Sequence, residues 1–216
     1  MKTILVLSPH PDDEAIGCGG TIRKHVTEGD AVHVTFLTSG EAGGDQPGLG
    51  PLREAEAAAA GEILGVKEIE FWREPDGRLD ARPELVERLV RRIQDLSADT
   101  IYVTHDRDMH TDHQMAAVLA FRALISLSTG AAATDPVPVV LMYEVWTPLQ
   151  ELTHIVDISD HMQLKLNAVR AHKTQCDIMP FDAAIEGLNR YRGEFHSWPG
   201  GSYAEVFRNL DPSMRL

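Results

Sequence analysis

The stretch Ser8-Pro9-His10-Pro11-Asp12-Asp13-Glu14 places one imidazole and three carboxylates within seven residues. Directly before it, Thr3–Leu7 is aliphatic and β-branched, which predicts a buried strand of a parallel sheet. Directly after it, Ala15–Ile22 is rich in small residues and predicts a helix that packs closely on that sheet. Two prolines stiffen the connecting turn, so its side chains are oriented before any ligand binds. A strand, a charged turn and a helix in this order predict an α/β fold.

The charged turn has two interpretations at this point. Asp12, Asp13 and Glu14 could cap the helix and complement its dipole. Alternatively, His10 and one carboxylate bind a metal, because charged groups at a buried strand end are costly to desolvate unless they are paired or bind an ion. Catalytic zinc usually takes three protein ligands and keeps one open position, so this interpretation needs a further ligand from elsewhere in the chain.

A second charged segment follows another predicted strand about a hundred residues later. Asp99–Thr104 is the strand, His105–His113 holds three histidines and three aspartates, and Gln114–Ala120 predicts the next helix. In an open α/β sheet such loops lie at the carboxyl edge, where ligands bind, and they meet if the two strands are neighbours. The same chemistry at two matching strand ends favours a metal site over a helix cap.

The rest of the chain alternates between strand and helix patterns. Strands are predicted at Ala31–Thr38, Glu68–Trp72, Val137–Trp146 and Ile155–Ile158, and helices at Arg53–Leu64, Leu85–Leu96 and Asp160–His172. Pro138 indicates an edge strand or the start of a strand. The alternation predicts a doubly wound, largely parallel sheet with helices on both faces, in a single domain spanning residues 1–216.

Composition excludes several classes of function. The formal net charge is −13 and no lysine- or arginine-rich run occurs, so we expect no nucleic-acid partner. The glycine-rich Ser39–Gly50 lacks the lysine and the spacing of phosphate-binding loops, and we interpret it as a flap over the site. Met1-Lys2 leads directly into a strand that is too short for a signal peptide or a membrane span. We therefore expect a cytoplasmic protein without membrane contact. Cys18 and Cys176 lack C-x-x-C spacing, and neither is expected to form a disulfide.

The two charged blocks resemble those of a known enzyme family. His10–Glu14 and Asp108–His113 are similar to the H-P-D-D-E and H-x-D-H blocks of zinc-dependent N-acetylglucosaminyl deacetylases related to LmbE and PIG-L. Arg53–Ala60 is similar to the family's R-x-x-E-x-x-x-A helix, and His172–Gln175 and Tyr203–Phe207 are similar to its later segments. The resemblance implies a Rossmann-like fold and, by analogy, a homo-oligomer such as a trimer or hexamer.

The resemblance also implies a ligand set. It assigns the metal to His10, Asp13 and His113, and it prefers Asp13 to Asp12, a choice that spacing alone does not make. Zn²⁺ is the expected cofactor, with another divalent metal such as Fe²⁺ as the alternative. Two histidines and one carboxylate form an open catalytic zinc site.

The remaining residues of the two blocks receive catalytic roles by the same resemblance. Asp12 takes a proton from the attacking water, and His110 stabilises the oxyanion or protonates the leaving amine. Asp112 is expected to orient His110. Glu14 either supports the ligand residues from behind or is a first-turn helix residue, and we favour the second interpretation. His105 and Asp108 flank the site and are interpreted as shaping its loop.

Arg53 and Asp76 are the expected substrate-binding residues. Arg53 resembles the family arginine that contacts a sugar hydroxyl or a substrate anion, and a surface ion pair with Glu54 or Glu56 is its alternative. Asp76 resembles a family acid that binds a sugar hydroxyl, although Pro-Asp-Gly is also strong turn chemistry.

The implied function is metal-dependent removal of the acetyl group from a small N-acetylglucosaminyl conjugate by a metal-bound water. N-acetylglucosaminyl-malate of bacillithiol synthesis is the first candidate substrate. The alternatives are a mycothiol-type or chito-oligosaccharide deacetylase or amidase, and a non-catalytic metal-binding protein on the same fold.

Overall fold

The strands form one seven-stranded sheet in the part of the chain that the structure describes. The structure is a computed structural model, and it describes residues 1–129, 136–196 and 201–211. The sheet has the order β3-β2-β1-β4-β5-β7-β6. The strands are β1 (Thr3–Ser8), β2 (Ala31–Thr38), β3 (Glu68–Glu74), β4 (Thr100–Thr104), β5 (Val139–Tyr143), β6 (His154–Asp157) and β7 (Ala204–Asn209).

Strands β1 to β5 pair in parallel, and this arrangement positions the site. β1 pairs with β2 on one side and with β4 on the other. The strand order therefore reverses direction at β1, and the segments that follow β1 and β4 leave the same edge of the sheet side by side. Ligands of open α/β sheets bind at this kind of crevice. The predicted doubly wound, largely parallel sheet is confirmed.

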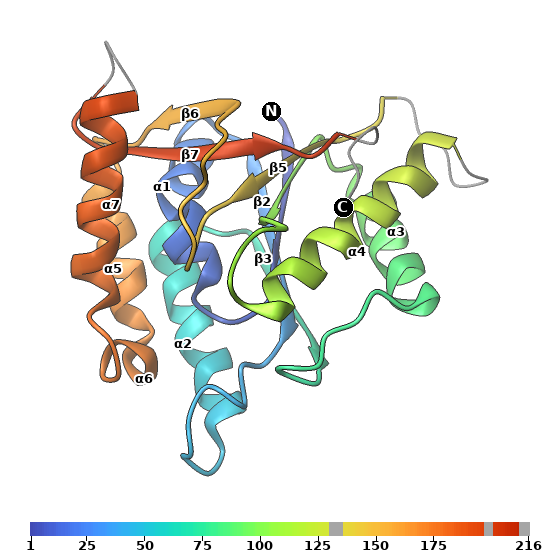
Figure 1. The fold of residues 1–216 in the computed structure, drawn as a ribbon, viewed down its shortest axis with the longest axis horizontal. Coiled ribbons are helices and arrows are strands. Elements are labelled where there is room, and N and C mark those ends of the chain that lie inside the picture. Colours follow the sequence, from blue (N-terminus) through green and yellow to red (C-terminus); the bar gives the residue numbers. More distant parts are fainter. Residues whose placement is uncertain (130–135, 197–200, 212–216) are drawn as a thin grey trace.

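The helices cover both faces of the sheet (Figure 1). They are α1 (Asp13–Thr27), α2 (Leu49–Leu64), α3 (Pro83–Leu96), α4 (Thr111–Thr129), α5 (Met162–Ala171), α6 (Lys173–Cys176) and α7 (Phe181–His196). Because successive strand residues point to opposite faces, Leu5 and Leu7 pack against α3 and α4, whereas Ile4 and Val6 pack against α1, α2 and α5.

Two elements differ from the sequence prediction. β7 was not predicted, and it pairs antiparallel with both β5 and β6. Its apolar residues are interrupted by Glu205 and Arg208, whose charged side chains are buried as well. Helix α7 packs on β7 and was not predicted either. Of the two alternatives for Pro138, the start of a strand is confirmed, because Pro138 directly precedes β5, and β5 is interior, between β4 and β7.

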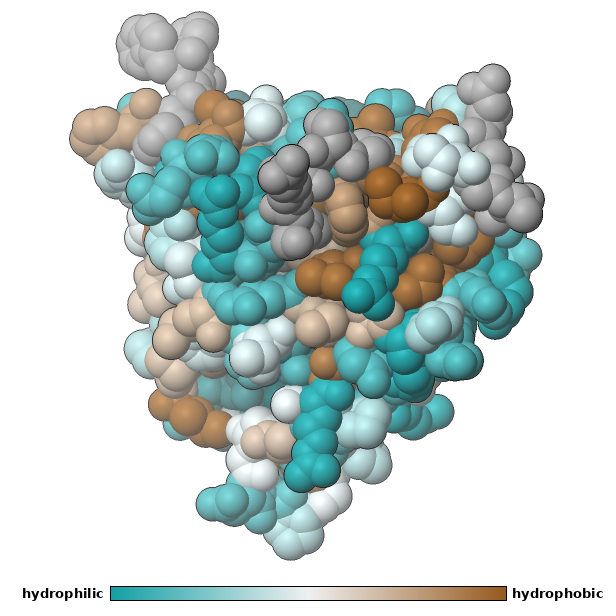
Figure 2. All heavy atoms as spheres, turned by 45° about the vertical axis from the view of Figure 1, so that its right-hand side comes forward, coloured by the Kyte–Doolittle hydropathy of each residue, from teal (hydrophilic) through white to brown (hydrophobic). Residues whose placement is uncertain are grey.

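The surface agrees with the polar composition. The face turned forward in Figure 2 is largely hydrophilic, with hydrophobic side chains gathered in its upper part. None of the described helices is long and apolar enough to cross a membrane. Cys18 is buried, Cys176 is partly buried, and both thiols are free.

Candidate active site

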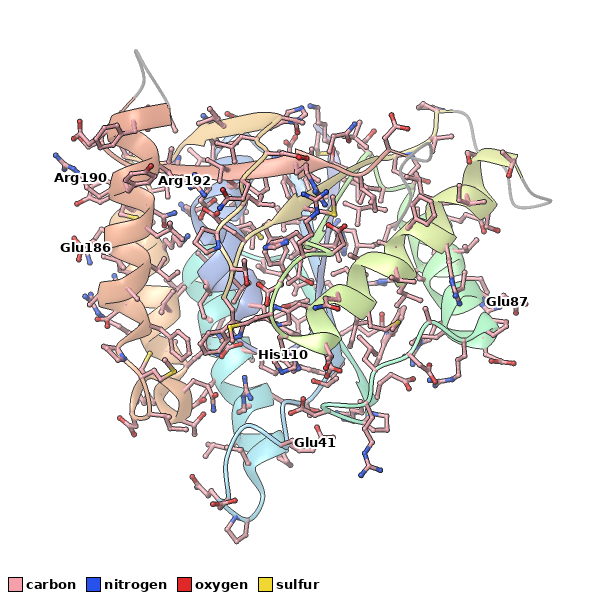
Figure 3. The ribbon with its side chains drawn as sticks, in the orientation of Figure 1. Glu41, Glu87, His110, Glu186, Arg190 and Arg192 are labelled. Atoms are coloured by element: carbon pink, nitrogen blue, oxygen red, sulfur yellow. The ribbon has the colours of Figure 1, made fainter. Side chains whose placement is uncertain are left out.

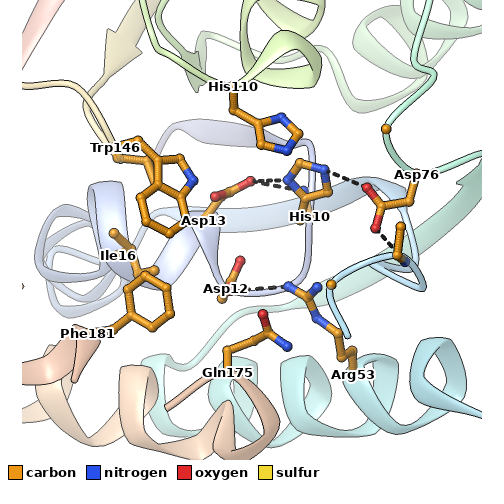
Figure 4. A pocket seen from close by; sticks show the side chains of 14 residues that line it. His10, Asp12, Asp13, Ile16, Arg53, Asp76, His110, Trp146, Gln175 and Phe181 are labelled. Atoms are coloured by element: carbon orange, nitrogen blue, oxygen red, sulfur yellow. Dashed lines mark hydrogen bonds and ion pairs between the residues drawn. The ribbon is translucent and has the colours of Figure 1, made fainter. Parts of the chain in front are cut away.

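The two charged segments meet at the carboxyl edge of the sheet, as the sequence predicts. The turn after β1 carries His10, Asp12 and Asp13, and His110 and His113 lie at the start of α4. The side chains of His10, Asp13 and His110 face one another across this edge (Figure 4). Neighbouring strands thus bring together residues that are a hundred positions apart.

Three potential ligand atoms form a small triangle. Asp13 Oδ2 lies 3.1 Å from His10 Nδ1 and 3.1 Å from His113 Nε2, and the two nitrogens are 3.3 Å apart. Donors bound tetrahedrally at about 2.0–2.1 Å lie about 3.3 Å from one another. All three side chains are buried. The donor set and its spacing therefore fit a divalent metal such as zinc.

The charges of these residues support one another. Burial alone would raise the pKa of Asp13, but the adjacent imidazoles of His113 and His10 lower it far below its usual range. Burial would lower the pKa of His113, but Asp13 and Asp108 raise it to about 9. The pKa of His10 is also raised, because hydrogen bonds to Asp112, Asp13 and Asp76 outweigh its burial. Asp13 is consequently a carboxylate at any physiological pH.

Asp12 has a different environment from Asp13. Its Oδ2 lies 3.1 Å from Arg53 Nη2, and both side chains are buried. Burial raises the pKa of Asp12 to about 6, and the Arg53 guanidinium limits this rise. Arg53 also donates to the backbone oxygens of Pro11, at 2.6 Å, and Gly40, at 2.9 Å. The alternative interpretation of Arg53, a surface ion pair with Glu54 or Glu56, is wrong, because Glu54 pairs with Arg73 and Glu56 binds Thr174.

A cavity of about 190 Å³ opens beside the triangle. One side is polar and the other apolar (Figure 4). The polar side is formed by His10, Asp12, Arg53, Asp76, His110 and Gln175, and the apolar side by Ile16, Val145, Trp146 and Phe181. The cavity therefore has room for a group on a small molecule.

The amino-acid sequence matches a known protein family over most of its N-terminal part. Residues 5–124, more than half of the chain, match the family described as PIG-L, GlcNAc-PI de-N-acetylase. The chain belongs to the PIG-L family.

Two curated relatives of this PIG-L family protein are deacetylases. The diacetylchitobiose deacetylase of Thermococcus kodakarensis is 33% identical over 194 residues, which cover 81% of this chain and 70% of that protein. A probable N-acetyl-α-D-glucosaminyl L-malate deacetylase 2 of Bacillus cereus is 26% identical over 206 residues, or 88% of this chain and 90% of that protein. Such enzymes hydrolyse an amide bond, and their names agree on an N-acetylated amino sugar.

A solved structure shares the whole fold. The 4-carboxy-2-hydroxymuconate hydratase of Pseudomonas putida KT2440 superposes with a TM-score of 0.86 and 24% identity, covering 100% of this chain and 99% of that chain. Because this hydratase catalyses a different reaction, the likeness concerns the fold alone. The chemistry of this PIG-L family protein has to be argued from its site.

Two carboxylates lie behind the potential metal ligands. Asp112 Oδ2 is 3.2 Å from His10 Nε2, and Asp108 Oδ1 is 3.3 Å from His113 Nδ1. Each carboxylate also accepts backbone hydrogen bonds, Asp112 from Gly77 N at 2.7 Å, and Asp108 from His110 N at 2.9 Å and from Trp146 N, in the segment after β5, at 3.0 Å. Carboxylates in this position fix the ring orientation of ligating histidines and raise their basicity.

This arrangement corrects the predicted role of Asp112. Its carboxylate contacts His10 and not His110, whose Nδ1 instead accepts a 3.1 Å hydrogen bond from the backbone N–H of Asp112. The orienting carboxylate of the loop is therefore Asp112 for His10 and Asp108 for His113. With Nδ1 accepting, a neutral His110 carries its proton on Nε2. Burial lowers the pKa of His110, as do the nearby His10 and His113.

Asp76 connects the glycine-rich loop to the site. Its Oδ1 is 3.0 Å from His10 Nε2, and its Oδ2 accepts a 2.8 Å hydrogen bond from Ala42 N. Glu41 accepts one from Asp76 N at 2.9 Å. Figure 3 shows Glu41 on this loop, at the same edge of the sheet as His110. Ala42 and Gly43 line the cavity, so the loop lies where the predicted flap would act.

Sequence reasoning missed part of the site. Trp146 and Phe181 form a wall of the cavity with their rings 5.4 Å apart, and neither lies in a motif. Gln175 also lines it, and its place in the H-x-(S/T)-Q segment was a usable signal. Glu14 lies in the first turn of α1, as predicted, and it is also buried and lies 3.3 Å from His172.

Proposed function

We propose that the protein is a metal-dependent hydrolase that removes the acetyl group from an N-acetylglucosaminyl glycoside. The observation that carries this proposal is the donor triangle of His10, Asp13 and His113 with the separate carboxyl group of Asp12 beside it. A metal store would require the triangle but no additional carboxyl group with a pKa of about 6. A divalent metal held there, Zn²⁺ or alternatively Fe²⁺, would polarise the acetyl carbonyl and acidify water.

The chain's own residues supply proton transfer and charge stabilisation. Asp12 takes a proton from the water that attacks the carbonyl carbon and delivers it to the amine nitrogen as the C–N bond breaks. Acetate and the free amino sugar are the products. A pKa of about 6 suits both steps near neutral pH. His110 presents Nε2–H to the carbonyl oxygen as negative charge develops on it.

The lining of the cavity favours a substrate in which the group attached to the N-acetylglucosaminyl sugar is uncharged. Among the described lining residues, Arg53 is the one lysine or arginine, and it already pairs with Asp12. The two carboxylates of a malate conjugate would face Asp76 without a free cation. Trp146 instead offers an aromatic surface, 39% exposed, on which a sugar ring can pack. We therefore favour a chito-oligosaccharide over the malate conjugate that the sequence suggested.

The test is a substrate panel with the zinc-loaded protein. N,N'-diacetylchitobiose, N-acetylglucosaminyl-malate and N-acetylglucosaminyl-inositol are incubated separately, and acetate and free amine are measured. We expect the highest kcat/KM for diacetylchitobiose, loss of turnover on chelation and recovery on adding zinc. Preference for the malate conjugate would overturn the substrate assignment. Stoichiometric metal without turnover of any N-acetylglucosamine derivative would favour the metal-binding alternative.

A further inference from the structure

Asp12 has a backbone conformation that residues other than glycine rarely adopt. Its φ is 130° and its ψ is −31°. Arg73 and Ser97, the other non-glycine residues with positive φ in the described chain, have values of 57° and 51° and lie in the ordinary left-handed region. A strained conformation of this kind persists only where the surrounding structure enforces it, and such residues cluster at active sites. The contacts that enforce it at Asp12 are therefore of functional interest.

Both ends of the peptide group between Pro11 and Asp12 are held by side chains. Arg53 Nη2 donates to Pro11 O at 2.6 Å, and Asp12 N donates to Glu14 Oε2 at 3.1 Å. The angle φ of Asp12 is the rotation about its N–Cα bond. Fixing the plane of the preceding peptide while Ile16 N holds Asp12 O at 2.9 Å leaves this rotation little freedom. The carboxyl group of Asp12 is aimed by these contacts.

The carboxylate of Glu14 is in turn contacted by His172. His172 Nε2 lies 3.3 Å from Glu14 Oε1, and the two side chains are 1% and 3% exposed. Each oxygen of the Glu14 carboxylate therefore has its own partner. The backbone of His172 is fixed where α5 meets α6, because its N–H donates to Val169 O and its oxygen accepts from Gln175 N. A buried carboxylate is costly to desolvate unless it is paired, so the contact with His172 offsets part of the desolvation cost of Glu14.

We propose that Glu14 and His172 are positioning residues that hold Asp12 in its strained, proton-accepting orientation. This inference rests on the proposed function, in which Asp12 moves the proton. A simple helix cap is the competing explanation, since a first-turn glutamate often bonds the N-cap N–H. A cap would affect the stability of α1, whereas a positioning residue affects kcat at an unchanged KM.

The experiment compares paired variants with a matched control. Glu14→Ala and His172→Ala remove the contacts, whereas Glu14→Gln keeps an acceptor for Asp12 N and His172→Gln keeps a donor for Glu14. Glu205→Gln is the control, because Glu205 is also buried, accepts backbone N–H groups of α1 from Gly20 and Thr21, and pairs with Lys165. Glu205 does not line the cavity. Each variant is assayed for kcat, KM, metal content and thermal unfolding.

We expect Glu14→Ala to lower kcat about 100-fold with KM and metal content unchanged, the scale of effect that misplacing a reacting group produces. Glu14→Gln and His172→Gln should retain more of kcat than the alanine variants. Glu205→Gln should lose stability and keep kcat. Equal kcat in Glu14→Ala and wild type, or a change in KM alone, overturns the proposal.

A crystal structure of Glu14→Ala gives a second readout that requires no substrate. We expect φ of Asp12 to relax to a negative value in the variant and to remain positive in wild type. A variant that keeps the wild-type φ contradicts the positioning role. If wild type cleaves no member of the panel, the proposed function fails, and the crystallographic comparison still decides whether Glu14 sets the conformation of Asp12.

Discussion

At the scale of single residues, Asp12 and Asp13 are chain neighbours with opposite pKa shifts. Burial raises the pKa of Asp12 to about 6, whereas for Asp13 the effect of burial is overcome by the imidazoles of His113 and His10. Adjacent carboxyl groups whose environments separate their pKa values can perform different tasks in one site. The separation supports the proposed division, in which Asp13 binds the metal and Asp12 transfers the proton.

Replacing Asp12 by asparagine should separate these two tasks. The amide has nearly the same shape but cannot accept the proton, so kcat should fall about 10²- to 10⁴-fold. The donor triangle excludes Asp12, so the zinc content should stay at the wild-type value. Steady-state kinetics and metal analysis of the same preparation measure both. Wild-type kcat in this variant would exclude Asp12 as the base.

Asp108 should affect the affinity for zinc and take no part in proton transfer. It lies against His113, so Asp108→Ala should weaken zinc binding about 10- to 100-fold. Asp80→Ala is the matched control, because Asp80 pairs with Arg82 at the surface. Competition with a zinc chelator measures both affinities. Equal affinities for the two variants would contradict the orienting role.

At the scale of elements, the small residues of α1 determine how closely the active-site turn packs on the sheet. The predicted close packing is confirmed, because a Cβ at Gly17 would overlap the ring of Tyr143 in β5. A Cβ at Gly20 would lie 2.7 Å from the side chain of Ile158. Helix α1 begins at Asp13, so a shift of this helix would also move the ligand set.

Gly17→Ala should destabilise the fold by about 1–3 kcal/mol, because the Tyr143 ring has to move. Gly187 offers the opposite case, since it lies within α7 and a Cβ there would meet no described atom within 4 Å. Gly187→Ala should stabilise by about 0.5–1 kcal/mol through its higher helix propensity. Urea unfolding of the two variants and wild type measures this difference. A loss of stability in Gly187→Ala equal to that in Gly17→Ala would refute the packing argument.

Local patterns predicted the elements that carry the site, but not the pairing of side chains within it. β1, β4 and the charged turns are visible in the sequence because each depends on neighbouring residues. The contact of Asp112 with His10 is not visible in the sequence, because it depends on how α4 docks against β1. β7 was missed because Glu205 and Arg208 are buried there, their charges paired with Lys165 and Asp106 from distant segments.

At the scale of the whole molecule, the site exists only in the folded chain. Its residues come from the turn after β1 and the start of α1, from α2, from the loop before α4 and the start of α4, and from the junction of α5 and α6. No short fragment contains the donor triangle together with Arg53 and His172. Folding and metal binding should therefore be coupled, since the unfolded chain presents no preformed site. The expected trimer or hexamer stays a prediction.

This coupling should be measurable as a metal-dependent melting temperature. Free zinc at about a hundred times its dissociation constant stabilises a folded protein by about 2.7 kcal/mol. For a chain of this length that corresponds to a rise in Tm of about 5–10 °C, and a chelator should reverse it. His113→Ala removes one corner of the triangle and should abolish most of the rise, whereas His33→Ala, at a histidine of β2 that pairs with Glu68, should keep it. Equal zinc-dependent rises in Tm in the two histidine variants would place the metal elsewhere, because His113 belongs to the triangle and His33 does not.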